Sequence, residues 1–243
     1  MVRLIFGVIA GFFAWAIVWV GSEQALSAIW PAWYGAHQTA FTAAIKGGGP
    51  FTAPLQLAGT VAVMLLVEYT PMARAWGWAR LVLQRRPLRQ VAGLRFAKVL
   101  GSGHEGGFGL RPSGSRQGLF LVFDDETSAR QFIASSPVLA RYRAHAKECC
   151  VALLRATSSK GSWSGAAMVP TATLPTDGPM AALTRASIRP RHLRAFWSLS
   201  PASEAVLAAS PGCELAVGLG EAPLVRQCTF SLWDSVASMD AYA

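Results

Sequence analysis

The sequence predicts an α+β fold in which two ferredoxin-like halves follow one another, preceded by one transmembrane helix. Two observations predict the halves. The order strand, helix, strand, strand, helix occurs twice, in residues 58–161 and 180–243, and each copy contains an aromatic strand that ends at an Asp. A third observation, a charge-free apolar run close to the N-terminus, predicts the membrane helix.

The repeat is clearest in its second and third strands. The strand "AKVLGSG" of the first half corresponds to "AVGLGE" of the second, and "FLVFDDETSARQF" corresponds to "FSLWDSVASMDAY". In the latter pair an alternating strand is followed by a helix that begins with Ser, Thr or Asp caps. The pattern predicts a duplicated βαββαβ unit, and two such units normally form one α+β barrel with the helices outside.

The two halves differ at their ends. The first closes with a predicted fourth strand at Cys149–Gly161, whereas the sequence ends at Ala243 inside the last predicted helix of the second. We therefore expect a domain that is truncated at its C-terminus. Residues 162–179 are rich in Gly, Pro, Ser and Thr and are predicted to be a linker.

Periodicity alone does not decide whether Leu57–Pro71 is a buried strand or a second membrane helix. The repeat places residues 61–70 opposite the predicted strand at 181–189, and Pro71 then opens a helix. We therefore predict one membrane helix in the chain and a strand at 61–70. The alternation predicts that one face of this strand carries Val61, Val63, Leu65 and Val67 and the other carries Met64 and Leu66.

The N-terminal run Leu4–Gly21 contains no charge and, at ~1.5 Å per residue, spans about 27 Å, enough for a bilayer core. A cleaved signal peptide is the alternative, but only Arg3 supplies a positive side chain before the run and no clear A-x-A cleavage site follows. We expect residues 1–57 to form a membrane anchor with an interfacial segment. The dense basic run after residue 71 favours a bacterial inner-membrane protein whose C-terminal domain is cytoplasmic.

The composition and charge of the chain indicate which kinds of molecule it binds. The chain is 52% hydrophobic and 14% charged, below the ~25% charged residues of an ordinary soluble domain. Its net charge is +9, and residues 71–98 hold seven Lys or Arg and no Asp or Glu, which suits an anionic membrane surface or an acidic protein. Nucleic acid is not expected, because no known nucleic-acid-binding signature accompanies the stripe. The four cysteines form no CxxC pair, so we expect reduced, packed thiols.

Five motifs occur in order: "LRFAKVLGSGHEGGF", "FDDETSARQFIASSP", "TSSKGSWSG", "AALTRASI" and "CTFSLWDSVASMDAYA". Over about residues 58–243 they resemble the spheroidene monooxygenase family, the acyclic carotenoid ketolases of purple bacteria. The resemblance implies a dimeric α+β-barrel-type fold with both halves in one chain. It also implies oxidation of the C-2 position of acyclic carotenoids such as spheroidene, with molecular oxygen, a bound haem and reduced ferredoxin. Residues 1–57 depart from the family and resemble the start of an unrelated small bacterial membrane protein.

The glycine-rich run Ala97–Phe108 is the most unusual local feature. A phosphate loop needs GxxxxGK[ST] or GxGxxG before a helix, whereas this run precedes a loop and a strand. It is either a glycine-rich hairpin or a loop whose bare backbone admits a flat cofactor or polyene. The resemblance favours the second for Gly101, Gly103, Gly107 and Phe108.

The haem that the resemblance implies would need cationic and ligating side chains. Lys98 and Arg185 lie at corresponding ends of the two halves, where they would either pair with haem propionates or be solvated. Haem iron needs an axial donor, usually His. His104 on the glycine-rich run is the candidate metal ligand, while His145 on a polar helix face and His192 at a helix start are weaker candidates. No Ser-His-Asp order, carboxylate pair or HExxH motif supports a hydrolase.

The sequence therefore predicts a haem-dependent monooxygenase that introduces a keto group at C-2 of an acyclic carotenoid. Two hydroxylations at one carbon, followed by loss of water, would leave the ketone. The expected partners are the membrane, the carotenoid and a ferredoxin-type electron donor. The alternative is a non-catalytic, membrane-anchored protein that binds haem or a polyene in a degenerate barrel.

Overall fold

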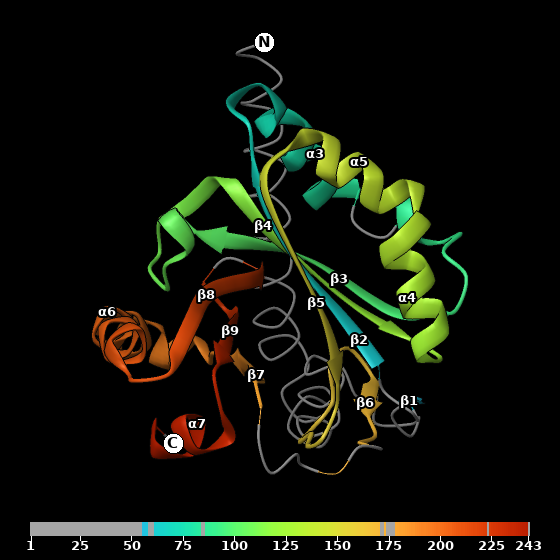
Figure 1. Ribbon diagram of the computed structural model, residues 1–243. Coiled ribbons are helices and arrows are strands. Elements are labelled where there is room, and N and C mark those ends of the chain that lie inside the picture. Colours follow the sequence, from blue (N-terminus) through green and yellow to red (C-terminus); the bar gives the residue numbers. More distant parts are fainter. Residues whose placement is uncertain are drawn as a thin grey trace, which may run out of the picture. The chain divides into compact units, whose positions relative to one another are not determined.

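The computed structural model describes residues 55–57, 61–83, 86–170, 173, 178–222 and 224–242 (Figure 1). The chain divides into two compact units, Met1–Leu55 with Ser162–Gly165, and Gln56–Gly161 with Ala166–Ala243. The second unit contains the sheet and helices described below. The predicted membrane helix at 4–21 lies outside the described residues, and none of the helices within them is long and apolar enough to cross a membrane.

The first half is a four-stranded antiparallel sheet with helices on one face. Its strands are hydrogen-bonded in the order β5-β2-β4-β3, the order of a ferredoxin-like βαββαβ unit. Its elements are β2 (Val61–Tyr69), η1 (Pro71–Ala73), α3 (Arg74–Leu83), η2 (Arg86–Leu88), β3 (Leu94–Gly103), η3 (His104–Gly106), β4 (Pro112–Phe123), α4 (Glu126–Ser135), α5 (Pro137–His145) and β5 (Ala146–Arg155). The prediction of a strand at 61–70 is confirmed, and that strand is central in the sheet.

The alternation along β2 separates two faces of this sheet. The predicted set Val61, Val63, Leu65 and Val67 belongs to one core cluster, which includes Phe132 of α4 and residues of α5 and against which residues of α3 pack. Met64 is buried but lies outside that cluster, on the opposite face. We call this opposite face, turned away from α3, α4 and α5, the second face.

The second half repeats the pattern with three strands. Its elements are β7 (Met180–Ser187), η4 (Pro190–His192), α6 (Leu193–Ala209), β8 (Cys213–Ala222), β9 (Arg226–Trp233) and α7 (Val236–Tyr242). The strand order β8-β9-β7 matches β3-β4-β2 of the first half. Pro71 opens η1 and Pro190 opens η4, so the two crossovers begin alike.

The halves join through β3 and β8, which lie antiparallel in the middle of the seven-stranded sheet β5-β2-β4-β3-β8-β9-β7 (Figure 1). The pairs that connect them are Gly101 with Gly220 and Ser102 with Leu219. Gly101 and Gly220 are equivalent positions of the sequence repeat, so an approximate two-fold axis passes between them. The duplication inferred from the sequence is thus built into the sheet.

Two predicted boundaries differ from the structure. The strand expected at Cys149–Gly161 is β5, which begins at Ala146 directly after α5 and ends at Arg155. The expected linker contains a short strand, β6 (Ala166–Met168), which pairs with β1 (Leu55–Leu57). Within the described part of the chain β7 is an end strand that pairs with β9 alone, and its side chains are half-buried or exposed.

Candidate functional site

The second face of the first half is apolar and buried. Its side chains come from alternate positions of three strands, because successive residues of a strand point to opposite faces. They include Met64 of β2, Phe96 and Leu100 of β3, and Phe120 and Val122 of β4. The sequence therefore places two aromatic rings on the sheet face that carries no helix of this half.

The same face continues onto the second half. Leu219, Cys228 and Phe230 are buried there, and Leu219 pairs with Cys228 across β8 and β9. Leu219 also lies over Gly118 of β4, where an added Cβ would be 2.9 Å from a Leu219 methyl group. The glycine thus leaves room for a side chain of the other half, and the two halves share one apolar surface.

A buried cluster of charges lies on this surface. The Lys98 ammonium of β3 and the Arg185 guanidinium of β7 both pair with the carboxylate of Glu221 on β8. The Arg185 Nε to Glu221 Oε2 distance is 3.2 Å, and the three side chains are 12%, 15% and 9% exposed in the order Lys98, Arg185, Glu221. We call these three residues the ion cluster. Buried charges require such pairing, because their desolvation costs several kcal/mol per ion.

The structure thus brings together the two cations that the sequence singled out, and it supplies a partner that the sequence reasoning missed. Glu221 pairs with both cations, so a propionate would have to compete with it. The signal that could have pointed to Glu221 is an acidic residue at the end of the apolar strand "LAVGLGE". Its alternation with Leu219 places both side chains on the same face.

Cys228 lies beside the ion cluster, directly opposite Arg185 in the β7–β9 pair. Burial, reinforced by the nearby Glu221 charge, raises the pKa of its thiol to about 12. At neutral pH this sulfur is therefore a protonated, packed thiol rather than a nucleophile, as expected for the cysteines.

The glycine-rich run forms the end of β3, the turn η3 and the loop that leads to β4. Gly103 has no room for a side chain, because a Cβ there would lie 1.9 Å from the Gly107 carbonyl oxygen. Gly107 in turn approaches Glu204 of α6, whose carboxylate accepts the Phe108 N–H at 2.9 Å, while Ser200 donates to the Phe108 carbonyl at 2.7 Å. The run thus docks on the second half, which accounts for these glycines by packing. Binding of a cofactor by Gly101, Gly103, Gly107 and Phe108 stays a prediction.

The described histidines do not form a haem-ligand site. His104 is exposed on η3, and the Nε2 of the exposed His192 accepts a hydrogen bond from Arg191. His145 is half-buried, because it stacks on Trp76 of α3 at 4.2 Å between ring centroids and bonds through Nδ1 to the Arg141 carbonyl. Across the described ranges no three His, Cys, Asp or Glu side chains gather as metal ligands.

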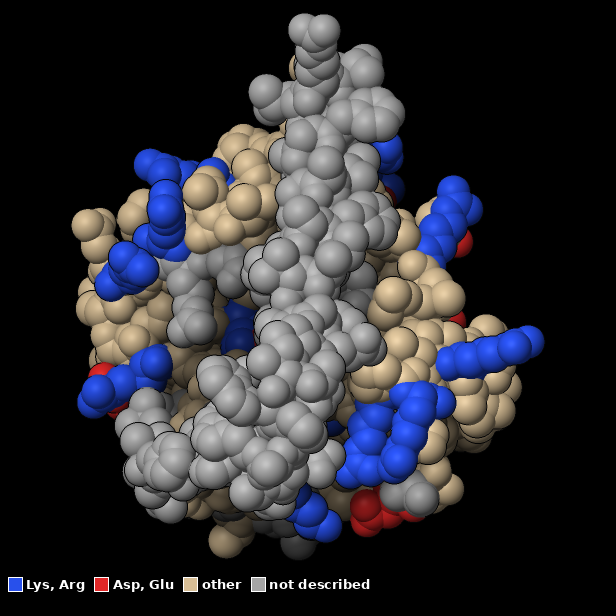
Figure 2. All heavy atoms as spheres, turned by 180° about the vertical axis from the view of Figure 1, so that it is seen from behind, with Lys and Arg blue, Asp and Glu red and all other residues tan. Residues whose placement is uncertain are grey.

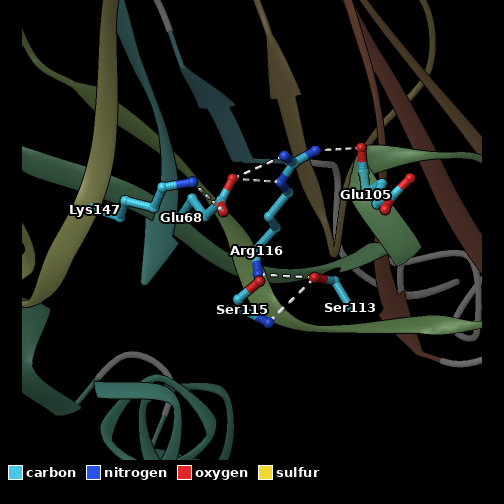
Figure 3. A network of polar contacts seen from close by, with 6 residues as sticks. All are labelled: Glu68, Glu105, Ser113, Ser115, Arg116 and Lys147. Carbon is cyan, nitrogen blue, oxygen red and sulfur yellow. Dashed lines mark hydrogen bonds and ion pairs between the residues drawn. The ribbon is translucent and has the colours of Figure 1, made fainter. Parts of the chain in front are cut away.

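A second polar network borders a pocket where the halves meet (Figure 3). Arg116 of β4 donates from Nε and Nη2 to Glu68 Oε2 at 2.9 and 2.8 Å, and from Nη1 to the Glu105 carbonyl. Lys147 reaches Glu68 Oε1 at 3.3 Å. The hydrogen bond from Arg116 is the main reason that the pKa of Glu68 is lowered.

The pocket beside this network has a volume of about 320 Å³, and we call it the interhalf pocket. It is lined by parts of β2, β3, β4 and β5, by η3, and by β8. Its apolar side chains include Leu66, Leu215 and Val217. The sequence reasoning gave no sign of it, because its walls come from segments of both halves.

Taken together, the described residues offer an apolar surface, a buried ion cluster and a pocket with a polar mouth. They do not offer a serine or cysteine nucleophile paired with a base. A pocket with apolar side chains in its wall suits the binding and orientation of an apolar group. Lys98 and Arg185 already pair with Glu221, and the described histidines are exposed or held by other contacts, so we derive no step through a haem.

Comparison with known proteins identifies relatives by sequence. No protein-family model matches the chain. A spheroidene monooxygenase of Rubrivivax gelatinosus is 52% identical over 185 residues, which cover 76% of this chain and 72% of that protein. The spheroidene monooxygenases of Rhodobacter capsulatus and Cereibacter sphaeroides are 38% and 31% identical, over 69% and 70% of this chain and 71% and 53% of their own lengths.

Solved structures give more distant likenesses. An anthrone oxidase-like protein is 16% identical with a TM-score of 0.31, covering 76% of this chain and 77% of its own. A mutant of SnoaB, a cofactor-independent oxygenase from Streptomyces nogalater, is 15% identical with a TM-score of 0.31, covering 42% of this chain and 97% of its own. The fold assignment rests on the strand order, to which these likenesses add nothing. The sequence identities, in contrast, are decisive: the chain belongs to the spheroidene monooxygenase family.

Proposed function

We propose that this protein is a carotenoid monooxygenase that introduces a keto group at C-2 of acyclic carotenoids such as spheroidene. The observation that carries the proposal is the 52% identity to the Rubrivivax gelatinosus enzyme over 76% of the chain. The position of oxidation follows from the family resemblance of the motifs quoted above. The same resemblance supports a dimeric α+β-barrel-type arrangement of the two halves.

The surface described above supports a substrate of this kind. A carotenoid is long and apolar, and the second face is apolar across both halves, with Phe96, Phe120 and Phe230 among its buried side chains. Aromatic rings provide large contact areas at little conformational cost. The protein's part would be to bind the polyene, hold one end in place and keep water away from it.

A bound haem, molecular oxygen and reduced ferredoxin complete the proposal because the family resemblance implies them. The visible spectrum of the chain purified in detergent, with a pyridine haemochrome assay, tests the haem directly. A stoichiometric haem band is the expected result. Its absence would remove haem from the proposal, and product analysis would then decide the oxygenase activity by itself.

The membrane and the electron donor are proposed as partners of a basic surface. On the face seen in Figure 2, Lys and Arg side chains stand out in several places and acidic ones are few. Arg74, Arg86 and Arg89 of the basic stripe are exposed, as are the apolar Met72 and Val82 beside them. Exposed apolar and basic groups together suit an anionic membrane surface, and the positive charge also suits an acidic ferredoxin. We place the protein at the bacterial inner membrane with this domain on the cytoplasmic side.

The test is expression of the full chain in bacterial cells that accumulate spheroidene but lack their own ketolase. Chromatography and mass spectrometry should show a product that has gained one oxygen and lost two hydrogens, with the red-shifted absorption of a longer conjugated system. Cells carrying the empty vector are the control. Bound but unconverted spheroidene would contradict the enzyme and favour the polyene-binding alternative.

A further inference from the structure

The interhalf pocket and the ion cluster lie at equivalent places in the two halves, related by the approximate two-fold axis. Counting from the equivalent glycines Gly101 and Gly220, the position of Lys98 corresponds to Val217 and that of Glu221 to Ser102. Both Val217 and Ser102 line the pocket.

The other strands give the same correspondence. Arg185 pairs with Cys228 in the second half, as Leu66 pairs with Gly118 in the first. Leu66, the counterpart of Arg185, also lines the pocket. The duplication has therefore produced two equivalent sites, of which one is filled by the ion cluster and the other is hollow.

The side chains explain why the second site is hollow. Where the first has two long cations and a carboxylate, the second has a valine, a serine and a leucine, which are shorter and uncharged. The Ser102 hydroxyl donates to the Gly218 carbonyl at 2.8 Å, so its proton is already engaged. At these three positions the pocket wall is therefore uncharged and mostly apolar.

Charged groups lie at the mouth instead. Glu105 and Glu148 are exposed, and Glu68 is tied to Arg116 and Lys147 by the ion pairs of Figure 3. The bond from Arg116 to the Glu105 carbonyl fixes the turn η3 against the sheet. A fixed polar rim around an apolar interior is typical of sites that take an apolar group from water or from a membrane.

The size of the pocket limits what it holds. Pockets for drug-sized ligands measure ~300–1,000 Å³, so a volume of about 320 Å³ suits the end of a long molecule rather than a whole carotenoid. We propose that the interhalf pocket binds one linear isoprenoid end of the polyene substrate, and that the ion cluster excludes this end from the equivalent site. The inference rests on the proposed function. It means that the protein binds the polyene in a single orientation, although its two halves are related by an approximate two-fold axis.

The test compares two tryptophan substitutions in the full chain in detergent. Val217→Trp fills the pocket, whereas Val206→Trp changes an exposed position of α6 and serves as the matched control. The readout is the circular dichroism that an achiral acyclic carotenoid gains in the visible range when a protein binds it, titrated with spheroidene. We expect Val217→Trp to raise Kd at least about tenfold and Val206→Trp to leave it unchanged.

A second measurement uses the unchanged protein and so does not depend on the folding of a variant. Cys150 is exposed and lines the pocket, so bound spheroidene should slow its alkylation by a maleimide. The pocket assignment is overturned if bound spheroidene does not protect Cys150 and the Val217→Trp variant binds spheroidene equally well. The proposed function is not affected by that result. A chain that shows no induced signal overturns both.

Discussion

Replacing Gly218 by alanine should destabilise the protein, because this glycine lets the two halves touch through their backbones. Gly218 lies in β8, under the loop that follows η3. A Cβ at this position would lie 2.4 Å from the Gly107 carbonyl oxygen and 3.0 Å from the Phe108 Cα. Both are backbone atoms, and the Phe108 peptide is held to α6 by two hydrogen bonds. The loop therefore cannot move aside without losing contacts.

The magnitude follows from these distances. Overpacking a well-packed site typically costs ~1–3 kcal/mol in the free energy of unfolding. A Gly→Ala change that causes no clash instead stabilises the protein by ~0.4–1 kcal/mol, because it reduces the conformational entropy of the unfolded chain. At ~2–4 °C per kcal/mol for a domain of this size, Gly218→Ala should lower Tm by about 2–12 °C.

The assay is thermal unfolding of the full chain in detergent, followed by circular dichroism. Gly109→Ala is the matched control, because no atom lies within 4 Å of a Cβ at that position. We expect the control to keep or slightly raise Tm. Equal Tm values for the two variants would show that the loop does not pack on β8 as described.

Three further predictions concern charged and titrating groups. Glu221→Gln leaves two buried cations without their carboxylate, so we expect a loss of ~3–5 kcal/mol in chemical denaturation, more than for any exposed glutamate. Cys228 should resist maleimide in the native chain at about pH 8 and react after denaturation, whereas exposed Cys150 reacts in both; rapid native labelling of Cys228 would contradict its burial. The pKa of Glu68 is lowered, so its stabilising effect is present above the ordinary value of 4.5 and is lost as the pH falls below it. The Tm difference between the wild type and Glu68→Gln should therefore stay constant from neutral pH to about pH 5 and shrink as the pH falls below 4.5. A difference that does not change below pH 4.5 would argue against the ion pair.

Local patterns were enough to predict much of the fold. Alternation of apolar residues and the proline at position 71 placed β2 and the helix that follows it, and the matching aromatic strands revealed the repeat. The β5 boundary was misjudged because α5 ends at His145 and β5 begins at the next residue, with no glycine or proline between them.

The site was less predictable because its contacts join distant segments. Lys98 and Arg185 were found as unusual cations, but the sequence does not show that Glu221 lies between them. That contact depends on the pairing of β3 with β8, which connects residues of different halves. The stacking of His145 on Trp76 likewise depends on how α5 lies beside α3.

The central claim is that this chain oxygenates an acyclic carotenoid. The most direct measurement incubates the purified full chain with spheroidene, a reductant and ¹⁸O₂, and determines the isotope in the product by mass spectrometry. We predict a ketone at C-2 that carries oxygen from O₂. The product must be analysed rapidly, because the carbonyl oxygen exchanges with water. Recovery of unmodified spheroidene from a folded chain that binds it would contradict the account.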